Sequence, residues 1–483
     1  MARRKRKTGA NGWLKQSNAA PVARSGYDGA NYSEKRGTIY WQTLDSRKEL
    51  DAYSRGQLIR KARWLYANTG VAQRVVDGLA NMVGYLTPQA ASTDEGWNNL
   101  AEEVFENRCN HAPTFDRAAK HTFYQWQLML SRLRMKDGDC MSVLSQSTGG
   151  FPQLINYEAH QIDNGTAKRD DTLMDGVRVD RFGRARAYRV VNMDNLEQFT
   201  EVPARDVIFH ADFKKPGQVR GVSILAHAIN HLIDRTETIA AVKHGIKIAN
   251  QFGYYIENAQ PNTGVNPLGQ QLRSGTVTSN GTTINVHDIY ESGSAPSLDQ
   301  GQKLQVLHDS RPHPNQQTFL EDLIRDIAWG VGVSPEIIWK ISGLTGAATR
   351  YVMAELDRWI AGQQELLQIA CQRWWNYFVA KEINAGRLPM PSDGRWWACS
   401  WLPQGSLTID RGREGNLQLA QLKVGALTKA DLYAAQGADW QTKARQRVKE
   451  VQMERELCES AGLDWAEVFG GATINTQPQQ PTQ

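Results

Sequence analysis

Two histidines and an aspartate have the spacing that metal sites on helices use. His227 and His231 lie four residues apart, and Asp234 follows three residues later. On a helix this spacing places the three side chains near one face, where they could bind a divalent metal ion. The same pattern is typical of a partly polar helix face at a subunit contact, and we favour that interpretation because such histidines are more often structural. The sequence therefore predicts no metal and no cofactor.

The chain lacks the short motifs of the common catalytic sites. It has no GxxxxGK[ST] phosphate loop, no HExxH metal helix and no GxSxG nucleophile turn. Gly330 and Gly332 lack the third glycine of a dinucleotide-binding loop, so we expect them to cap a helix. The acidic residues do not form the cluster that a two-metal nuclease needs. These observations favour a structural protein, and a metal-dependent nuclease or DNA-processing enzyme is the alternative.

The composition is that of a globular protein with several domains. The chain has 483 residues, of which 41% are hydrophobic and 22% are charged, and its formal net charge is +5. The five cysteines form no CxxC pair, which indicates reduced thiols and a protein made in the cytoplasm. No run of about 18 apolar residues exists, so we expect no membrane contact. The mild charge excludes a histone-like protein but not a local DNA-facing surface.

Hydrophobic periodicity predicts an α+β fold with a clear order of parts. Residues 1–50 form an N-terminal arm whose basic start, Arg3 to Lys7, is either a contact for nucleic acid or an acidic partner, or a solvated tail. Residues 51–84, with a break at Gly70, and residues 97–137 are predicted to be helical. Residues 138–213 carry short strands, including a hairpin that turns at Gly183. Further helices are predicted over residues 223–250, 315–331, 347–385 and 412–467. The charge-free tail 470–483 is predicted to be disordered.

Residues 258–303 differ from their neighbours, because they hold six glycines, three prolines and only five charged residues. Within them, Asn280-Gly281 stands between flanks rich in threonine and valine, which predicts a β-hairpin. The segment is inserted between two long helices, so it should form a small β-rich module at their tip. An unpaired strand edge there could pair with a neighbouring subunit.

Four segments resemble a known family when they are taken together in chain order. They are Leu58–Asn68 with Asn81–Gly84; Pro216–Ser223; Phe319–Glu336; and a C-terminal set of Trp401–Pro403, Ile409–Glu414, Gly425–Thr428 and Gly437–Trp440. Each segment is a weak signal alone, but their order and spacing over about residues 40–468 are specific. With the order of predicted elements, they resemble the portal proteins of tailed phages, in particular the lambda-type portal family.

The resemblance implies a portal fold with an α/β wing, a two-helix stem, a small β-rich clip, a long wing helix and an α-helical crown. The implied boundaries are the N-terminal arm 1–50, wing 51–222, stem helix 223–257, clip 258–312, second stem helix 313–335, tunnel loop 336–347, long helix and wing return 348–410, crown 411–469 and tail 470–483. We also expect Trp359, Trp374 and Trp375 on the long helix to pack the wing against the crown.

The resemblance further implies a homo-oligomeric, dodecameric ring at one capsid vertex of the virion, assembled in the host cytoplasm. Double-stranded DNA would pass through the axial channel, without sequence specificity, during packaging and ejection. The implied protein partners are the terminase large subunit, the head–tail connector or adaptor, and the major capsid and scaffolding proteins.

A channel for moving DNA should contact phosphates weakly, because each contact adds a salt-dependent hold on the DNA. The predicted channel residues are Lys243, Lys247, Arg325 and Lys340, together with Ser342, Gly343, Leu344 and Thr345 of the tunnel loop, where Leu344 could form an apolar constriction. For each basic residue the alternative is a solvated side chain or an inter-subunit salt bridge. The predicted partner-binding residues of the clip are Thr276, Val277, Asn280, Gly281, Ile284 and Val286.

Overall fold

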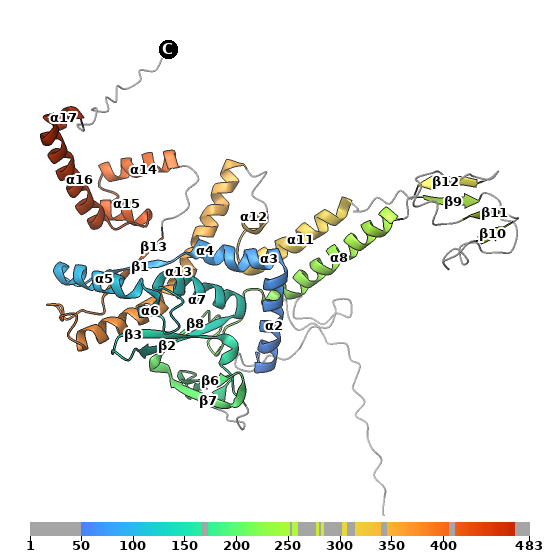
Figure 1. Cartoon of the computed structure of the whole chain (residues 1–483), viewed down its shortest axis with the longest axis horizontal. Coiled ribbons are helices and arrows are strands. Elements are labelled where there is room, and N and C mark those ends of the chain that lie inside the picture. The colour runs from blue at the N-terminus through green and yellow to red at the C-terminus, as the bar shows by residue number, and fades with distance from the viewer. Residues whose placement is uncertain are drawn as a thin grey trace, which may run out of the picture.

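The computed structural model describes residues 50–165, 172–251, 254–258, 277–279, 282–284, 302–306, 314–339, 345–404 and 411–468. These residues form an elongated molecule (Figure 1). A body of helices and small sheets lies at its centre. A pair of helices leads from the body toward short strands at one end, and a group of C-terminal helices stands at the other end.

The body begins with helices that the apolar periodicity predicted. Helix α2 (Ala52–Asn68) starts at Asp51, whose carboxylate accepts a hydrogen bond from the Ser54 N–H at 2.8 Å. After a break at Thr69, the chain continues through α3 (Gly70–Gln73), a π-helical turn (Arg74–Gly78) and α4 (Leu79–Val83). The next helices are α5 (Glu95–Cys109), α6 (Ala112–Phe115) and α7 (Phe123–Asp137).

Two antiparallel sheets follow, so the predicted α+β character of this region is confirmed. The three-stranded sheet has the order β3-β2-β8, and the four-stranded sheet has the order β4-β5-β6-β7. Their strands are β2 (Asp139–Gln146), β3 (Pro152–Glu158), β8 (Val207–Ala211), β4 (Leu173–Met174), β5 (Val177–Val179), β6 (Ala185–Asn192) and β7 (Asn195–Pro203). The predicted hairpin is the β5–β6 pair, and Gly183 in its turn has φ +83°.

The long helix α13 (Gly346–Asn384) crosses the body and supplies much of its core. The rings of Trp374 and Phe115 lie 5.1 Å apart, and those of Trp375 and Phe105 lie 5.4 Å apart. Trp359 donates a hydrogen bond to the Val331 carbonyl oxygen. The expectation that Trp374 and Trp375 pack the wing against the crown is therefore wrong, because both are fully buried where α5, α6 and α13 meet. For the partly buried Trp359, it stays a prediction.

A long-range strand pair closes the body. Strand β1 (Leu86–Ala90) is antiparallel to β13 (Cys399–Pro403), with Leu86 opposite Pro403 and Ala90 opposite Cys399. The Gln127 side chain supports β1 from α7, since it accepts from the Leu86 N–H and donates to the Leu86 carbonyl oxygen. The segment after α13 is thereby held against the start of the body.

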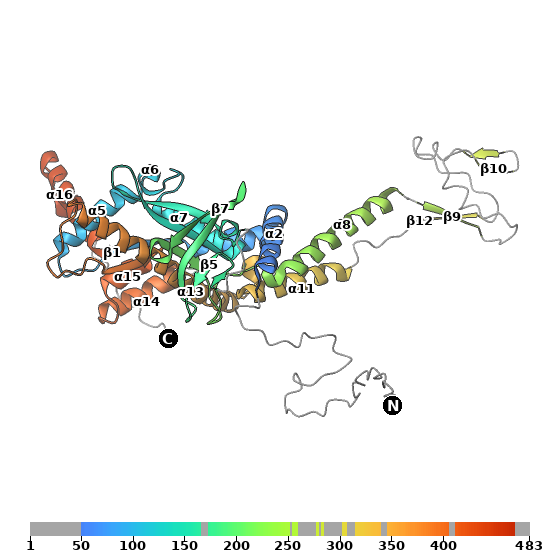
Figure 2. The same ribbon diagram turned by 90° about the horizontal axis from the view of Figure 1, so that it is seen from below.

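Helices α8 (Ile229–Gln251) and α11 (Pro314–Val331) form the pair that leaves the body (Figure 2). The predicted start of the first helix at residue 223 is wrong. The Ser223 hydroxyl accepts a hydrogen bond from the Leu225 N–H, and a 3-10 turn at Ala226–Ala228 precedes the helix. Gly332 caps α11 with φ +89°, as predicted. Pro335 then begins the short helix α12 (Pro335–Ile338).

The strands at the far end of this pair form two small antiparallel units. Strand β9 (Tyr254–Asn258) pairs with β12 (Gln302–Val306), and β10 (Val277–Ser279) pairs with β11 (Thr282–Ile284). Ser279 lies opposite Thr282, so the predicted hairpin around Asn280-Gly281 is confirmed.

The C-terminal helices are α14 (Arg411–Lys423), α15 (Lys429–Ala435), α16 (Trp440–Ala461) and α17 (Trp465–Val468). The prediction of helices in this region is confirmed. Two of the helices have a side-chain cap: Thr428 caps α15 and Asp439 caps α16. Among the residues that the structure describes, no helix is both long and apolar enough to span a membrane.

Candidate functional site

The seam between α8 and α11 accounts for the histidine spacing noted in the sequence. His231 Nε2 lies 3.0 Å from an Asp326 carboxylate oxygen, and His227 Nε2 donates to the Ile327 carbonyl oxygen at 3.2 Å. Gly330 permits this approach, because a Cβ atom at that position would lie 1.9 Å from the His227 ring. Over the described ranges, no group of three His, Cys, Asp or Glu residues could hold a metal ion. The two histidines join the helices of one chain.

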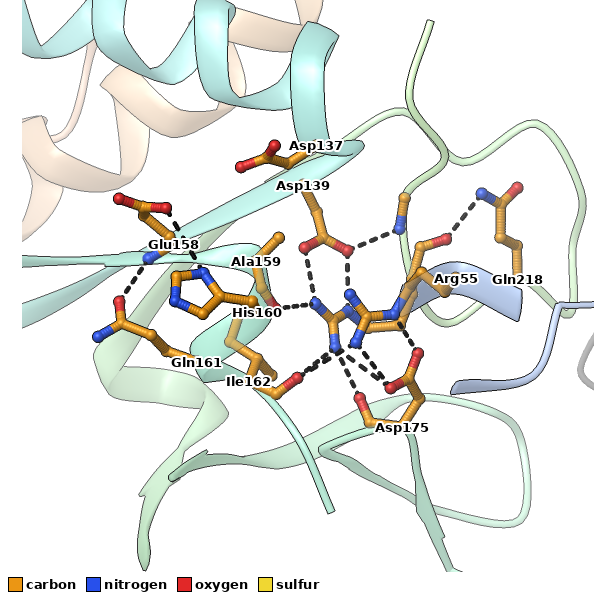
Figure 3. A network of polar contacts seen from close by, with 12 residues as sticks. Arg55, Asp137, Asp139, Glu158, Ala159, His160, Gln161, Ile162, Asp175 and Gln218 are labelled. Carbon is orange, nitrogen blue, oxygen red and sulfur yellow. Dashed lines mark hydrogen bonds and ion pairs between the residues drawn. The ribbon is translucent and has the colours of Figure 1, made fainter. Parts of the chain in front are cut away.

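A buried charge network fixes the segment that leads into α8. The Arg220 guanidinium forms two hydrogen bonds of 2.8 Å with the Asp139 carboxylate at the start of β2. It also donates to the carbonyl oxygens of Ala159, Ile162 and Asp175 at 2.7–2.8 Å. Figure 3 shows these acceptors converging from β2, the 3-10 turn after β3 and the β4–β5 turn. Arg220 is thus bound from three sides of the body.

The first helix of the body joins the same network. Arg55 on α2 forms a salt bridge with Asp175 and donates to the Ile162 carbonyl oxygen. About two turns further along α2, Arg63 binds Asp137 through two hydrogen bonds of 3.0 and 2.7 Å and contacts Glu158 at 2.7 Å. These contacts connect α2 and the end of α7 to both sheets.

Burial sets the electrostatics of this network. Burial alone would lower the pKa of Arg220, but the charge and hydrogen bonds of Asp139 reverse the effect and raise that pKa. Burial, together with the positive charge of Arg63, lowers the pKa of His160. A buried ion pair with every donor satisfied holds one geometry, and loss of one partner leaves an uncompensated buried charge. Arg220, whose donors are all bound, therefore acts as an anchor, whereas Nη1 of Arg55 is buried without a hydrogen-bond partner.

Two glycines let the backbone pass beside this network. Gly138 has φ +102°, and a Cβ atom at Gly221 would lie 1.9 Å from the Gly138 carbonyl oxygen. The Gly221 N–H donates to Asp139 at 2.8 Å. Together with the Arg220 contacts, this close approach fixes the direction in which the chain enters α8.

The structure places the predicted basic channel residues at different positions along the helix pair. Lys243 and Lys247 are exposed on the half of α8 that lies away from the body. Arg325 on α11 is exposed too, and it forms a 2.8 Å salt bridge with Asp322. Within the described residues, Lys243 and Lys247 have no acidic partner. The three side chains do not form one cluster within a single chain.

The predicted loop residues Lys340, Ser342, Gly343 and Leu344 lie outside the described residues. Thr345 is described, and its hydroxyl caps α13 by accepting from the Ala348 N–H. Before the loop, the Arg235 guanidinium lies over the Trp339 ring at 5.4 Å from its centroid. This contact joins α8 to the residue that follows α12.

Of the predicted clip residues, Val277 and Ile284 lie opposite each other in the β10–β11 pair. Thr276, Asn280, Gly281 and Val286 lie outside the described residues. The sequence analysis missed the Arg220–Asp139 anchor, although Gly138 beside Asp139 and Gly221 beside Arg220 are signals that a backbone passes close by.

Comparisons with known proteins agree with this architecture. The family model described as phage portal protein, lambda family, matches residues 35–364. No curated protein matches the chain. The fold is similar to that of a chain in the neck of an empty gene transfer agent particle, whose structure was computed with C6 symmetry. The TM-score is 0.51 at 12% identity, and the match covers 80% of this chain and 93% of that chain.

A second solved structure, the neck of a native gene transfer agent particle computed with C12 symmetry, gives a TM-score of 0.50 at 14% identity. It covers 80% of this chain and 94% of that chain. At these identities the likeness concerns the fold alone. The family match, in contrast, spans more than half of the chain and includes helices α2 to α7, the anchor, the α8–α11 pair and the first part of α13. The protein therefore belongs to the lambda family of phage portal proteins, which are structural proteins and not enzymes.

Proposed function

We propose that this chain forms a closed, dodecameric ring at one vertex of a phage capsid, and that double-stranded DNA passes through its axial channel during packaging and ejection. The observation that carries the proposal is the family match over residues 35–364, joined to a helix pair that extends from an anchored body. The similar neck chain from a particle computed with C12 symmetry supports the subunit number. The enzymatic alternative, a metal-dependent nuclease, is wrong because the family is structural.

In this proposal, the parts of the chain correspond to the parts of a portal. Helices α8 and α11 are the stem, the strands β9 to β12 belong to the clip, the body is the wing and the C-terminal helices are the crown. Residues 336–347 form the tunnel loop between α11 and α13. The anchor then has a mechanical role, since it transmits force between wing and stem through satisfied, buried contacts.

Lys243 and Lys247 are the proposed DNA contacts of the stem. Both are exposed, and symmetry would repeat them around the ring. A few separated positive charges keep DNA centred but hold it weakly, because affinity grows with the number of phosphates neutralised. Arg325 is a weaker candidate, since Asp322 already compensates its charge.

The clip strands are the proposed docking site for the terminase large subunit and later for the head–tail connector. Short antiparallel pairs such as β9–β12 and β10–β11 present strand edges that another chain can extend. We propose that the wing contacts the major capsid and scaffolding proteins. Assembly would take place in the host cytoplasm, with the finished ring in the virion.

The test is native mass spectrometry of the purified protein, together with electron-microscopy averages of the same sample. A species of about 650 kDa with a central hole, as expected for twelve copies of the 54.2-kDa chain, supports the proposal. Particles of one or two chains at every salt concentration would overturn it.

A further inference from the structure

The C-terminal helices leave most of their apolar side chains uncovered. Among residues 415–465 and Val468, whose side-chain burial the structure describes, Cys458 is the one buried side chain. The exposed large apolar side chains are Leu417 and Leu419 on α14, Val424 directly after it, and Trp440, Val448, Met453 and Leu457 on α16. Helices are held in place by burying an apolar face, so this segment needs a covering surface that one chain does not supply.

The uncovered side chains lie on two opposite sides of each helix. On α16, Val448 and Leu457 are nine residues apart, which corresponds to about half a turn of difference in direction at 3.6 residues per turn. They are 58% and 57% exposed. On α14, Leu417 and Leu419 diverge in the same way. A helix that is apolar on both sides fits between two neighbours, which is the situation of every subunit in a ring.

The charges of α16 are arranged against its own dipole. The N-terminal half carries Lys443, Arg445, Arg447 and Lys449 without an acidic residue, and the C-terminal half carries Glu450, Glu454, Glu456 and Glu459 with Arg455. Positive charge near the N-terminus and negative charge near the C-terminus of a helix are both unfavourable. Arg447 forms salt bridges with Glu450 and Glu454. Within the described part of the chain, Lys443, Lys449, Glu456 and Glu459 form none.

We propose that α16 of one subunit docks head to tail against α16 of the adjacent copy, with the basic half of one helix beside the acidic half of the next. The two-sided apolar surface and the two-ended charge both point to this partner. A head-to-tail contact uses two different surfaces, so it repeats from subunit to subunit and closes as a ring. The inference rests on the proposed ring and adds to it the surface that orders the C-terminal helices.

Two half-reversal variants test the docking. Glu456→Lys with Glu459→Lys changes the acidic half, and Lys443→Glu with Lys449→Glu changes the basic half. Hydrogen exchange of α16 is measured in the assembled ring at low salt and in unassembled subunits, and native mass spectrometry reports the assembly. We expect each variant to lose at least about tenfold of the protection of α16 in the ring. The four-residue charge swap should restore it.

The direction of the change in hydrogen-exchange protection distinguishes docking between subunits from a change in the stability of the isolated helix. Each half-reversal improves the match to the helix dipole, so an isolated α16 should become more stable. Protection that stays the same or rises in the assembled ring would therefore overturn the proposal. If deletion of residues 469–483 removes the protection, the chain's own tail covers α16, and this result also overturns it. A wild-type ring in which α16 exchanges freely contradicts the docking but not the ring, whereas absence of any ring contradicts the proposed function.

Discussion

The anchor and helix α16 use the same kinds of residue in opposite ways. In the anchor, the Arg220 and Asp139 side chains are 2% and 0% exposed and are bound on every side. On α16, Arg447 is 60% exposed and contacts acidic residues of its own helix. The body thus completes this charge network within one chain, while the C-terminal helices leave most of their apolar side chains exposed. This difference is what we expect if other copies cover the C-terminal helices in the proposed ring.

Removal of one partner from the anchor should have the largest effect on stability. Arg220→Ala leaves the Asp139 carboxylate buried without a counter-ion, and we expect a loss of about 3–5 kcal/mol in the free energy of unfolding. The measurement is urea unfolding of the body followed by tryptophan fluorescence.

Arg447→Ala is the matched control on α16. It removes an exposed arginine with two acidic partners, so we expect a change of no more than about 1 kcal/mol. Equal losses of unfolding free energy for the two variants would show that the buried anchor and the exposed contacts of Arg447 contribute equally to stability, against our expectation.

Acidic pH should lower the free energy of unfolding of the body through His210, a buried histidine on β8. Burial, with the positive charge of Arg134, lowers the pKa of His210 to about 3. The folded state holds this imidazole neutral while the unfolded chain protonates it near its ordinary pKa, so its contribution is present at neutral pH and falls as the pH drops. By pH 4.5 we expect a loss of about 2–3 kcal/mol from this residue.

The test of this assignment is the pH dependence of unfolding in His210→Gln. The variant should show a flatter fall in stability between pH 6.5 and about 4.5 than the wild-type protein, because glutamine does not titrate. An unchanged slope would assign the acid sensitivity to other groups.

A smaller pH effect of opposite sign on the free energy of unfolding is expected at Glu102, where the body meets the C-terminal helices. Glu102 lies in a hollow of about 300 Å³ between α5 and the C-terminal helices, which Asp431 and Asp439 also line. Burial raises the pKa of Glu102 to about 6, and the nearby Asp439 acts in the same direction. This raised pKa means that the protonated form suits the folded state, so the contribution is present below about pH 4.5 and is lost as the pH rises through about 6.

Glu102→Gln mimics the protonated carboxyl and keeps an oxygen that can accept from the Ala90 N–H. Above pH 6 we expect it to stabilise the contact by no more than about 1 kcal/mol, since the group is partly solvated. At pH 4.5 the variant and the wild-type protein should have equal stability. A stabilisation that does not depend on pH would contradict this account.

Thiol labelling compares the body with the C-terminal helices in the wild-type protein, so no substitution alters its stability. Cys109, Cys140 and Cys371 are buried in the body, and burial raises the pKa of each thiol. We expect them to resist iodoacetamide in the folded protein, whether or not it is assembled. Cys458 is also buried within the single chain, so it reacts only when α16 opens locally. We expect this reaction to be faster in unassembled subunits than in the proposed ring, as mass spectrometry of peptides would detect. Equal protection of all four thiols in the unassembled chain would show that α16 needs no partner.

Helices and hairpins, which depend on residues close together in the sequence, were predicted from local sequence patterns. The period of α13 gave its ends within one residue, and the glycine turns gave the β5–β6 and β10–β11 hairpins. The start of α8 was misplaced because the Ser223 side chain holds a turn that apolar spacing does not reveal.

Contacts between distant segments could not be predicted. Arg220 and Asp139 are 81 residues apart, and no local rule selects one pair among many acidic and basic residues. Strand β1 was missed because Pro88 and Gln89 make it a poor strand by composition, and its partner β13 follows more than 300 residues later. The candidate DNA-contacting and docking residues were chosen through the family resemblance, and they stay predictions.

The β1–β13 pair has a consequence for the order of events during synthesis. Strand β1 leaves the ribosome early, but its partner is made about 300 residues later: Ala90 and its partner Cys399 are 309 residues apart (399 − 90), and Leu86 and its partner Pro403 are 317 residues apart (403 − 86). At 5–20 residues per second, about 15–60 s pass before the two strands can meet. During that time the open edge of β1 and the aromatic core that α13 completes are exposed. In the proposed ring, assembly of each subunit would therefore wait until nearly its whole body has been translated.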